Sequence, residues 1–138
     1  MDRALIERKL ELLRGHLARV RDKRPLSAGV LAADADLQDV IVLNLSRAVQ
    51  TCVDIGAHMV VDTGLPPPAT MGETFDRMAA TQLIDAELAT RLRRAVGFRN
   101  LAVHAYESID WALVHLLSGA PLADFDHFAA AVVRALDG

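Results

Sequence analysis

One stretch of the chain gathers the side chains best suited to act on a phosphate. Between Arg91 and Tyr106 there are four arginines, one asparagine, one histidine and the only tyrosine of the protein, on a background of small and apolar residues. Histidine exchanges a proton near neutral pH. Arginine keeps its charge and can hold two phosphate oxygens at once. These residue types together favour phosphodiester chemistry.

Cleavage of RNA without a metal ion needs three functions. A base removes the proton of the 2′-hydroxyl, an acid protonates the leaving 5′-oxygen, and a positive charge stabilises the phosphorane between them. His104 can serve as base or acid, and Arg99 can hold the phosphate. One histidine per motif is short of an acid and base pair, so we expect a symmetric homodimer that brings two motifs to one cleft.

The spacing Arg99-x4-His104-x-Tyr106 resembles the Arg-x4-His-x-Tyr motif of the HepT-type toxins, members of the HEPN superfamily of helical ribonucleases. The Phe98-Arg99-Asn100 lead-in and the upstream run from Arg47 to His58 are also similar to that family, so the likeness covers most of the chain. The resemblance implies an all-α HEPN-like bundle, a homodimer and a metal-independent endoribonuclease that needs no cofactor. Asn100 would then be a positioning donor beside Arg99 and His104.

The resemblance further implies a partner. HepT-type toxins form type VII toxin–antitoxin pairs with a minimal nucleotidyltransferase, the MntA-like antitoxin. In that family the antitoxin transfers AMP onto the tyrosine of the motif, which in this chain is Tyr106. A rival function is a non-catalytic HEPN dimer that binds nucleotide or a nucleotidyltransferase and cleaves nothing.

Each residue of the motif also has a plain structural interpretation. His104 could be a buried histidine bonded to a backbone carbonyl, and Arg99 an ordinary interface salt bridge. Tyr106 could be a core aromatic with a solvated hydroxyl. The remaining arginines could form a solvated face: Arg91, Arg93 and Arg94.

Helical geometry sets a constraint on this motif. Residues five apart on an α-helix differ by about 140°, so Arg99 and His104 do not share a face, whereas Asn100 and His104 do. Either the helix ends near residue 104, or Arg99 reaches around it, or the catalytic set spans two protomers. Gly97 would let another helix or an RNA backbone approach closely.

A second polar feature lies upstream on an otherwise apolar segment. We call it the polar stripe; its members follow a 3-4-3-4 spacing and are Asn44, Arg47, Thr51, Asp54 and His58. We expect it to line a cleft or an interface, with Asp54 orienting His104 or pairing with Arg99; the alternative is a structural network that specifies the dimer. A metal site is not expected, because no HExxH or His-x3-His pattern is present.

The elements that must position these residues are all helical. No segment alternates with period two, and the apolar spacing predicts five to six helices in one domain over residues 1–138. The expected helices cover 3–22, 36–61, 70–80, 86–105, 108 or 110 to 117, and 122–136, with a short turn of helix within 26–33.

Composition narrows the class of protein. Aromatic residues are only 4% of the chain, which disfavours nucleic-acid binders built on stacking platforms, and the single cysteine excludes a disulfide scaffold. The net charge is −3, yet residues 91–99 carry four arginines and no acid. We therefore expect an acidic outer surface with a basic cleft for a specific RNA. The N-terminus lacks the pattern of a signal peptide, and we expect a cytoplasmic protein without a membrane segment.

Overall fold

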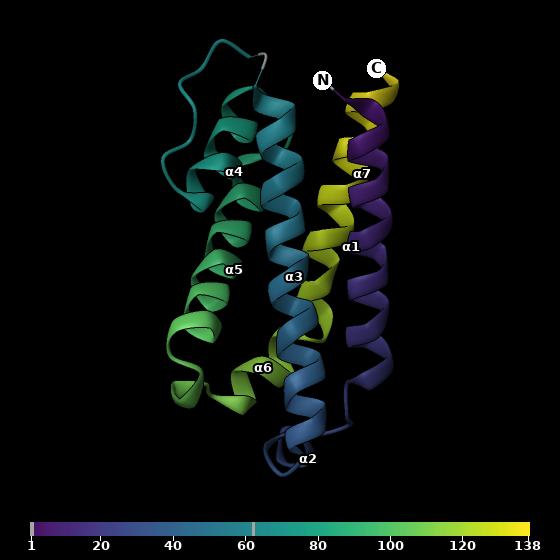
Figure 1. Ribbon diagram of the computed structural model, residues 1–138, viewed down its shortest axis with the longest axis vertical. Helices are drawn as coiled ribbons and strands as arrows, with labels where there is room; N and C mark the ends of the chain where they lie inside the picture. The colour runs from purple at the N-terminus through teal and green to yellow at the C-terminus, as the bar shows by residue number, and fades with distance from the viewer. Residues whose placement is uncertain (1, 62) are drawn as a thin grey trace.

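A computed structural model describes residues 2–61 and 63–138, and every regular element in them is helical (Figure 1). The elements are α1 (Arg3–Lys23), α2 (Ala28–Ala32), α3 (Ala35–Val60), α4 (Met71–Ala80), α5 (Ala86–His104), η1 (Tyr106–Ser108), α6 (Trp111–Leu117), η2 (Ala120–Leu122) and α7 (Ala123–Asp137). The all-α prediction is confirmed. The expected number of five to six was low, because the short turn within 26–33 forms α2 and brings the α-helices of these residues to seven.

Side chains that cap the first turn decide where most helices begin. A capping oxygen accepts a backbone N–H that has no partner inside the helix, which stabilises the helix start. Asp34 caps α3 by accepting the Leu37 N–H. The other caps are Asp2 for α1, Ser27 for α2, Thr70 for α4, Asp85 for α5 and Asp110 for α6.

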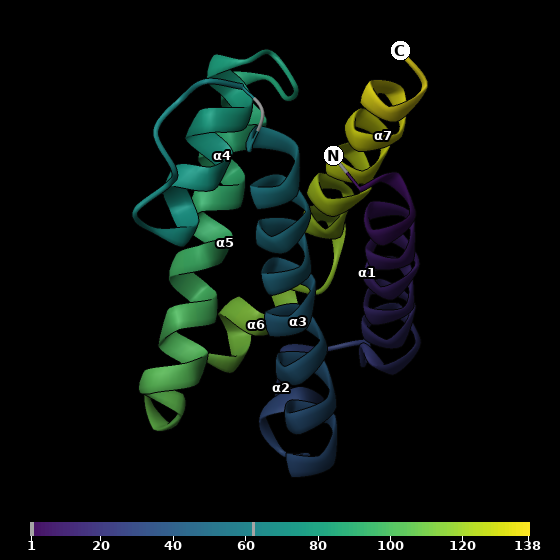
Figure 2. The same cartoon turned by 45° about the horizontal axis from the view of Figure 1, so that its top comes forward.

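The long helix α3 lies at the centre of the bundle (Figures 1 and 2). It contacts α1, α4 and α5 along its length and also touches α2 and α7. By length and composition alone it could cross a membrane, but 61% of its most apolar window is buried inside the fold. The helix therefore behaves as the core helix of a soluble protein does.

All seven α-helices contribute side chains to one apolar core. Its largest members are Phe75 of α4 and Phe128 of α7, both fully buried. Their rings meet edge to face with centroids 6.0 Å apart. This edge-to-face contact stabilises the core in addition to the hydrophobic burial of the two rings.

A single arginine fastens α6 to the end of α1. The Arg24 guanidinium donates to the carbonyl of His115 from Nε (3.0 Å) and from Nη2 (2.9 Å). The Nε2 of His115 in turn donates to the carbonyl of Pro25 at 2.9 Å. A cation at the carboxyl end of a helix satisfies carbonyls that have no partner in the helix. These bonds fix α6 against the segment that follows α1.

The direction of α3 and α5 decides which residues can meet. The two helices run antiparallel, so the start of α3 and the end of α5 lie at the same end of the bundle (Figure 1). The end of α3 lies at the opposite end, beside α4. Residues late in α3 are therefore remote from the end of α5.

Gly56 permits the close approach of α3 and α4 and provides a test of this packing. A Cβ atom at this position would lie 2.6 Å from Thr74 Cγ2 and 2.8 Å from Met78 Sδ. We expect Gly56→Ala to lower the free energy of unfolding by about 1–3 kcal/mol, as overpacked cores do. Urea denaturation followed by circular dichroism measures the change. Gly15→Ala on α1 is the matched control, because nothing lies within 4 Å of the added atom. Equal urea midpoints for Gly56→Ala and wild type would contradict the packing described.

Candidate functional site

The motif helix α5 ends at His104. Ala105 leaves the helical conformation with φ −147° and ψ 52°, and its N–H donates to the Leu101 carbonyl. Tyr106 then begins the short helix η1. The helix thus ends near residue 104, but Arg99 and His104 both lie within α5, so this end does not by itself bring their side chains to one face.

His104 and Arg99 are both open to a ligand. His104 is exposed at the last position of α5, and its ring has no hydrogen bond among the residues described. The interpretation of His104 as a buried histidine is therefore wrong. Arg99 is half-buried and donates from Nη1 to Oδ1 of the exposed Asn100 at 3.3 Å. No carboxylate in the described part of the chain pairs with Arg99, so its guanidinium is free to hold an anion.

Tyr106 is held by two contacts. Its hydroxyl donates to Oδ1 of Asp39 at 2.9 Å. Its ring packs edge to face with that of Trp111, with ring centroids 5.9 Å apart. Desolvation, followed by the hydrogen bond to Asp39, raises the pKa of Tyr106 to about 12. The residue is still 38% exposed, so it is not the core aromatic considered above. Sequence reasoning missed Asp39, because it lies 67 residues before Tyr106 with no motif around it.

Two members of the polar stripe, Asn44 and Asp54, contact α1 and not the motif. Asp54 accepts a hydrogen bond from Gln50 at 3.0 Å and lies 3.6 Å from the Lys9 ammonium. Asn44 Oδ1 lies 3.4 Å from Nδ1 of His16, which is also on α1. Along α3, Asp54 is about 22 Å from the level of Asp39. The expectation that Asp54 orients His104 or pairs with Arg99 is not met within the chain, because α3 and α5 are antiparallel.

The two other charged or titratable members of the stripe also lie away from the end of α5. Arg47 is exposed about 12 Å along α3 from the level of Asp39. Its backbone carbonyl accepts the hydroxyl of Thr51. His58 is half-buried in the last turn of α3, at the far end of the bundle. The structure therefore does not join Arg47 or His58 to the motif of the same chain.

Two of the four arginines in the basic segment are neutralised. Arg91 pairs with Asp124 at 2.9 Å, and Arg93 pairs with Asp76. Arg94 is exposed and makes no ion pair within residues 2–61 and 63–138. The positive charge available from this segment is thus concentrated on Arg94 and Arg99.

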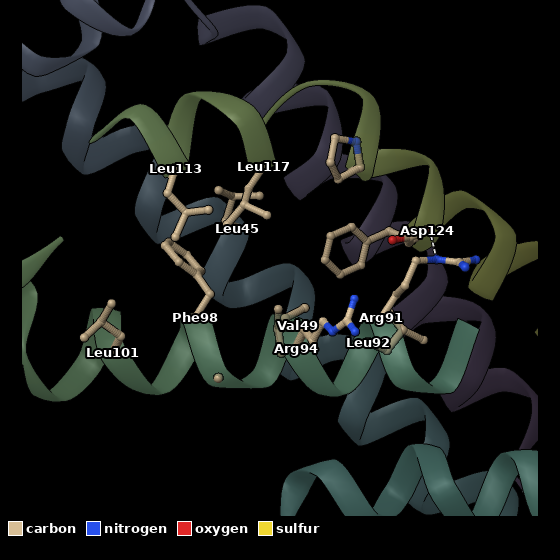
Figure 3. Close-up of a pocket in the computed structure, with 14 residues that line it drawn as sticks. Leu45, Val49, Arg91, Leu92, Arg94, Phe98, Leu101, Leu113, Leu117 and Asp124 are labelled. Atoms are coloured by element: carbon tan, nitrogen blue, oxygen red, sulfur yellow. Dashed lines mark hydrogen bonds and ion pairs between the residues drawn. The ribbon is translucent and has the colours of Figure 1, made fainter. Parts of the chain in front are cut away.

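An apolar groove opens beside the motif helix (Figure 3). Its volume is about 450 Å³, and its walls come from α3, α5, α6 and α7. Phe98 and Leu101, which flank Arg99 and Asn100 in sequence, line it together with Leu113 of α6. We call this feature the α5 groove. Gly97 also lines it, and nothing lies within 4 Å of a Cβ atom built there.

The residues described support neither a cysteine nucleophile nor a metal site. Cys52 is buried in the core, and burial raises the pKa of its thiol well above the ordinary value, so it is not an activated nucleophile. Across residues 2–61 and 63–138, no three His, Cys, Asp or Glu side chains come together as a metal site requires.

The single tyrosine makes its hydrogen bond directly measurable. We expect absorbance at 295 nm to titrate with a midpoint near pH 12, because burial and Asp39 both favour the neutral phenol. Asp39→Ala removes the acceptor and the nearby negative charge, so the midpoint should fall toward ~10, the value of a free tyrosine. Circular dichroism at each pH verifies that the protein remains folded. A wild-type midpoint at 10 would show that the bond does not form in solution.

Comparison with known proteins places the chain among HepT-type proteins. It is 35% identical to the mRNA nuclease HepT of Shewanella oneidensis over 95 residues, which is 69% of this chain and 71% of that protein. The fold superposes with a TM-score of 0.87 on a tri-AMPylated HEPN toxin of Shewanella oneidensis solved in complex with its MNT antitoxin, at 29% identity over 98% of this chain and 99% of the other.

A second solved structure, a toxin–antitoxin with AMP-PNP, also gives a TM-score of 0.87, at 27% identity over 96% of this chain and 99% of the other. The family model described as ribonuclease HepT-like matches residues 6–132, which is nearly the whole chain. This chain, whose α5 carries an exposed histidine and an arginine without a carboxylate partner among the described residues, thus belongs to the HepT-like ribonuclease family.

Proposed function

We propose that this chain is a metal-independent endoribonuclease, the toxin of a type VII toxin–antitoxin pair acting in the cytoplasm. The observation that carries the proposal is the end of α5, where His104 is exposed and follows Arg99 on the same helix; within the described residues His104 has no hydrogen bond from its ring and Arg99 has no carboxylate partner. Family membership and the mRNA nuclease relative support the choice of RNA as substrate.

The chemistry follows from the two side chains. His104 takes the proton of the 2′-hydroxyl or gives a proton to the leaving 5′-oxygen, since imidazole does both near neutral pH. Arg99 stabilises the charge that develops on the phosphorane oxygens. The amide of Asn100 accepts a hydrogen bond from Arg99 and so orients the guanidinium. Arg94, which is free of acidic partners within the described residues, adds attraction for the RNA backbone.

A homodimer supplies the second histidine that acid and base catalysis requires. The surface around the motif suits such an interface, because the α5 groove is apolar and Gly97 leaves room for a partner helix. Leu113, which lines the groove, is an exposed apolar side chain at 40%. An interface here places the end of α5 of each protomer close to the other.

The proposed partner is an MntA-like nucleotidyltransferase antitoxin that transfers AMP to Tyr106. Support comes from the structural relative that is tri-AMPylated and bound to its antitoxin. Tyr106 lies two residues after His104 and is partly exposed. A phosphodiester at its hydroxyl would add an anion and an adenosine beside the catalytic side chains, which would compete with RNA for Arg99.

Removal of either catalytic side chain tests the ribonuclease. We expect His104→Ala and Arg99→Ala each to lower cleavage of total RNA by at least ~10²-fold in the presence of EDTA, because each acts on the transition state. Both residues lie outside the buried core, so melting temperatures should stay near the wild-type value. Arg93→Ala is the matched control, since its guanidinium is paired with Asp76 and it does not line the α5 groove. Cleavage by His104→Ala at the wild-type rate would refute the proposal, and no cleavage by wild type would favour the non-catalytic HEPN dimer.

Assembly is tested at Gly97. We expect wild type to be a dimer at micromolar concentration and Gly97→Arg to be a folded monomer without ribonuclease activity, because the new side chain occupies the space for the partner helix. Light scattering gives the mass and circular dichroism the helix content. Gly15→Arg on the exposed side of α1 is the control and should remain a dimer. If Gly97→Arg is still a dimer, the interface does not lie at the α5 groove.

A further inference from the structure

The contact between Tyr106 and Asp39 joins two segments that the motif does not connect. We infer that Asp39 is the proton acceptor for Tyr106 when a nucleotidyl group is transferred to the tyrosine oxygen. The inference rests on the proposed function, because it assumes that Tyr106 receives AMP from ATP. It assigns a role to a residue of α3 that lies outside the motif.

The geometry has the form that proton transfer requires. The hydroxyl of Tyr106 donates to a carboxylate oxygen of Asp39 at 2.9 Å, within the range of a general base and its substrate. The hydroxyl makes no other hydrogen bond in the described part of the chain. Its lone pairs therefore remain available to a phosphorus atom while its proton points at Asp39. The edge contact with Trp111 holds the ring in this position.

Tyr106 needs such an acceptor more than an ordinary tyrosine does. Its pKa is raised to about 12, so almost all of it is the neutral phenol at neutral pH. A phenol that attacks phosphorus must lose its proton as the new bond forms. In phosphoryl transfer to hydroxyl groups, an aspartate that accepts the hydroxyl proton performs this task. Asp39 is exposed, so it can release the proton to water after the step.

Nucleotidyl transfer to Tyr106 forms one bond to phosphorus and breaks another. The Oη of Tyr106 forms a bond to the α-phosphorus of ATP, and the bond from that phosphorus to the oxygen bridging to the β-phosphate breaks. Pyrophosphate leaves with the electron pair of the broken bond. The phenolic proton moves to the carboxylate of Asp39. The product is a tyrosyl–AMP phosphodiester.

Other titratable groups near this corner come from each neighbouring element. They are Asp36 on α3, His104 at the end of α5, Glu107 in η1 and Asp110 before α6. None forms a hydrogen bond or ion pair with Tyr106 or Asp39 among the described residues. Asp39 is therefore the group positioned to take this proton.

The test compares Asp39→Asn with wild type. Asparagine keeps the shape and an acceptor oxygen for the Tyr106 hydroxyl, but it does not take a proton at neutral pH. Each protein is incubated with the MntA-like partner and ATP, and intact mass gives the rate of the first AMP addition. We expect Asp39→Asn to be at least ~10²-fold slower at pH 7. Its rate should rise about tenfold per pH unit from 7 to 9, as hydroxide replaces the base, while the wild-type rate stays flat.

Two further variants separate the possible outcomes. Asp36→Asn removes an exposed carboxylate one turn earlier on α3 and should react like wild type. Tyr106→Phe should gain no AMP, which identifies the acceptor. An Asp39→Asn rate within twofold of wild type would overturn the inference, and so would a slow rate that does not rise with pH. Absence of AMP on wild type, with RNA cleavage intact, would instead overturn the proposed AMP transfer.

Discussion

The fold depends on covering α3. This helix is apolar around most of its circumference, and in water such a helix is stable only when other helices bury it. α1 covers one side, α4 and α5 cover another, and α2 and α7 also contact it. Two polar residues of α3 mark the side where it meets α1: Asp54 pairs with Lys9, and Asn44 lies beside His16. These two members of the stripe are therefore part of the α1–α3 contact.

The antiparallel packing of α5 on α3 then determines the composition of the candidate site. It brings Asp39, near the start of α3, to the hydroxyl of Tyr106 just beyond the end of α5. It also separates Asp54 from the motif by several helical turns. The same packing exposes the last turn of α5, since α4 covers the amino-terminal part of that helix and not its end (Figure 1).

Ion pairs reduce the number of free positive charges on the motif helix α5. Asp76 of α4 and Asp124 of α7 each neutralise one arginine on α5. Arg94 and Arg99 remain without acidic partners in the described residues, and Arg94 lines the apolar α5 groove. A protein with a net charge of −3 can in this way keep a locally cationic surface.

The sequence by itself determined the helices and the motif, because these depend on residues close along the chain. Apolar spacing, capping aspartates and the Arg99–Tyr106 spacing are all local signals. Only the tertiary structure decided which distant residues meet. The partner of Tyr106 on α3, the pairing of two arginines on α5 and the orientation of Asp54 toward α1 depend on the direction and rotation of packed helices. Local periodicity shows which face of a helix is buried, and the packed bundle selects the helix that covers it.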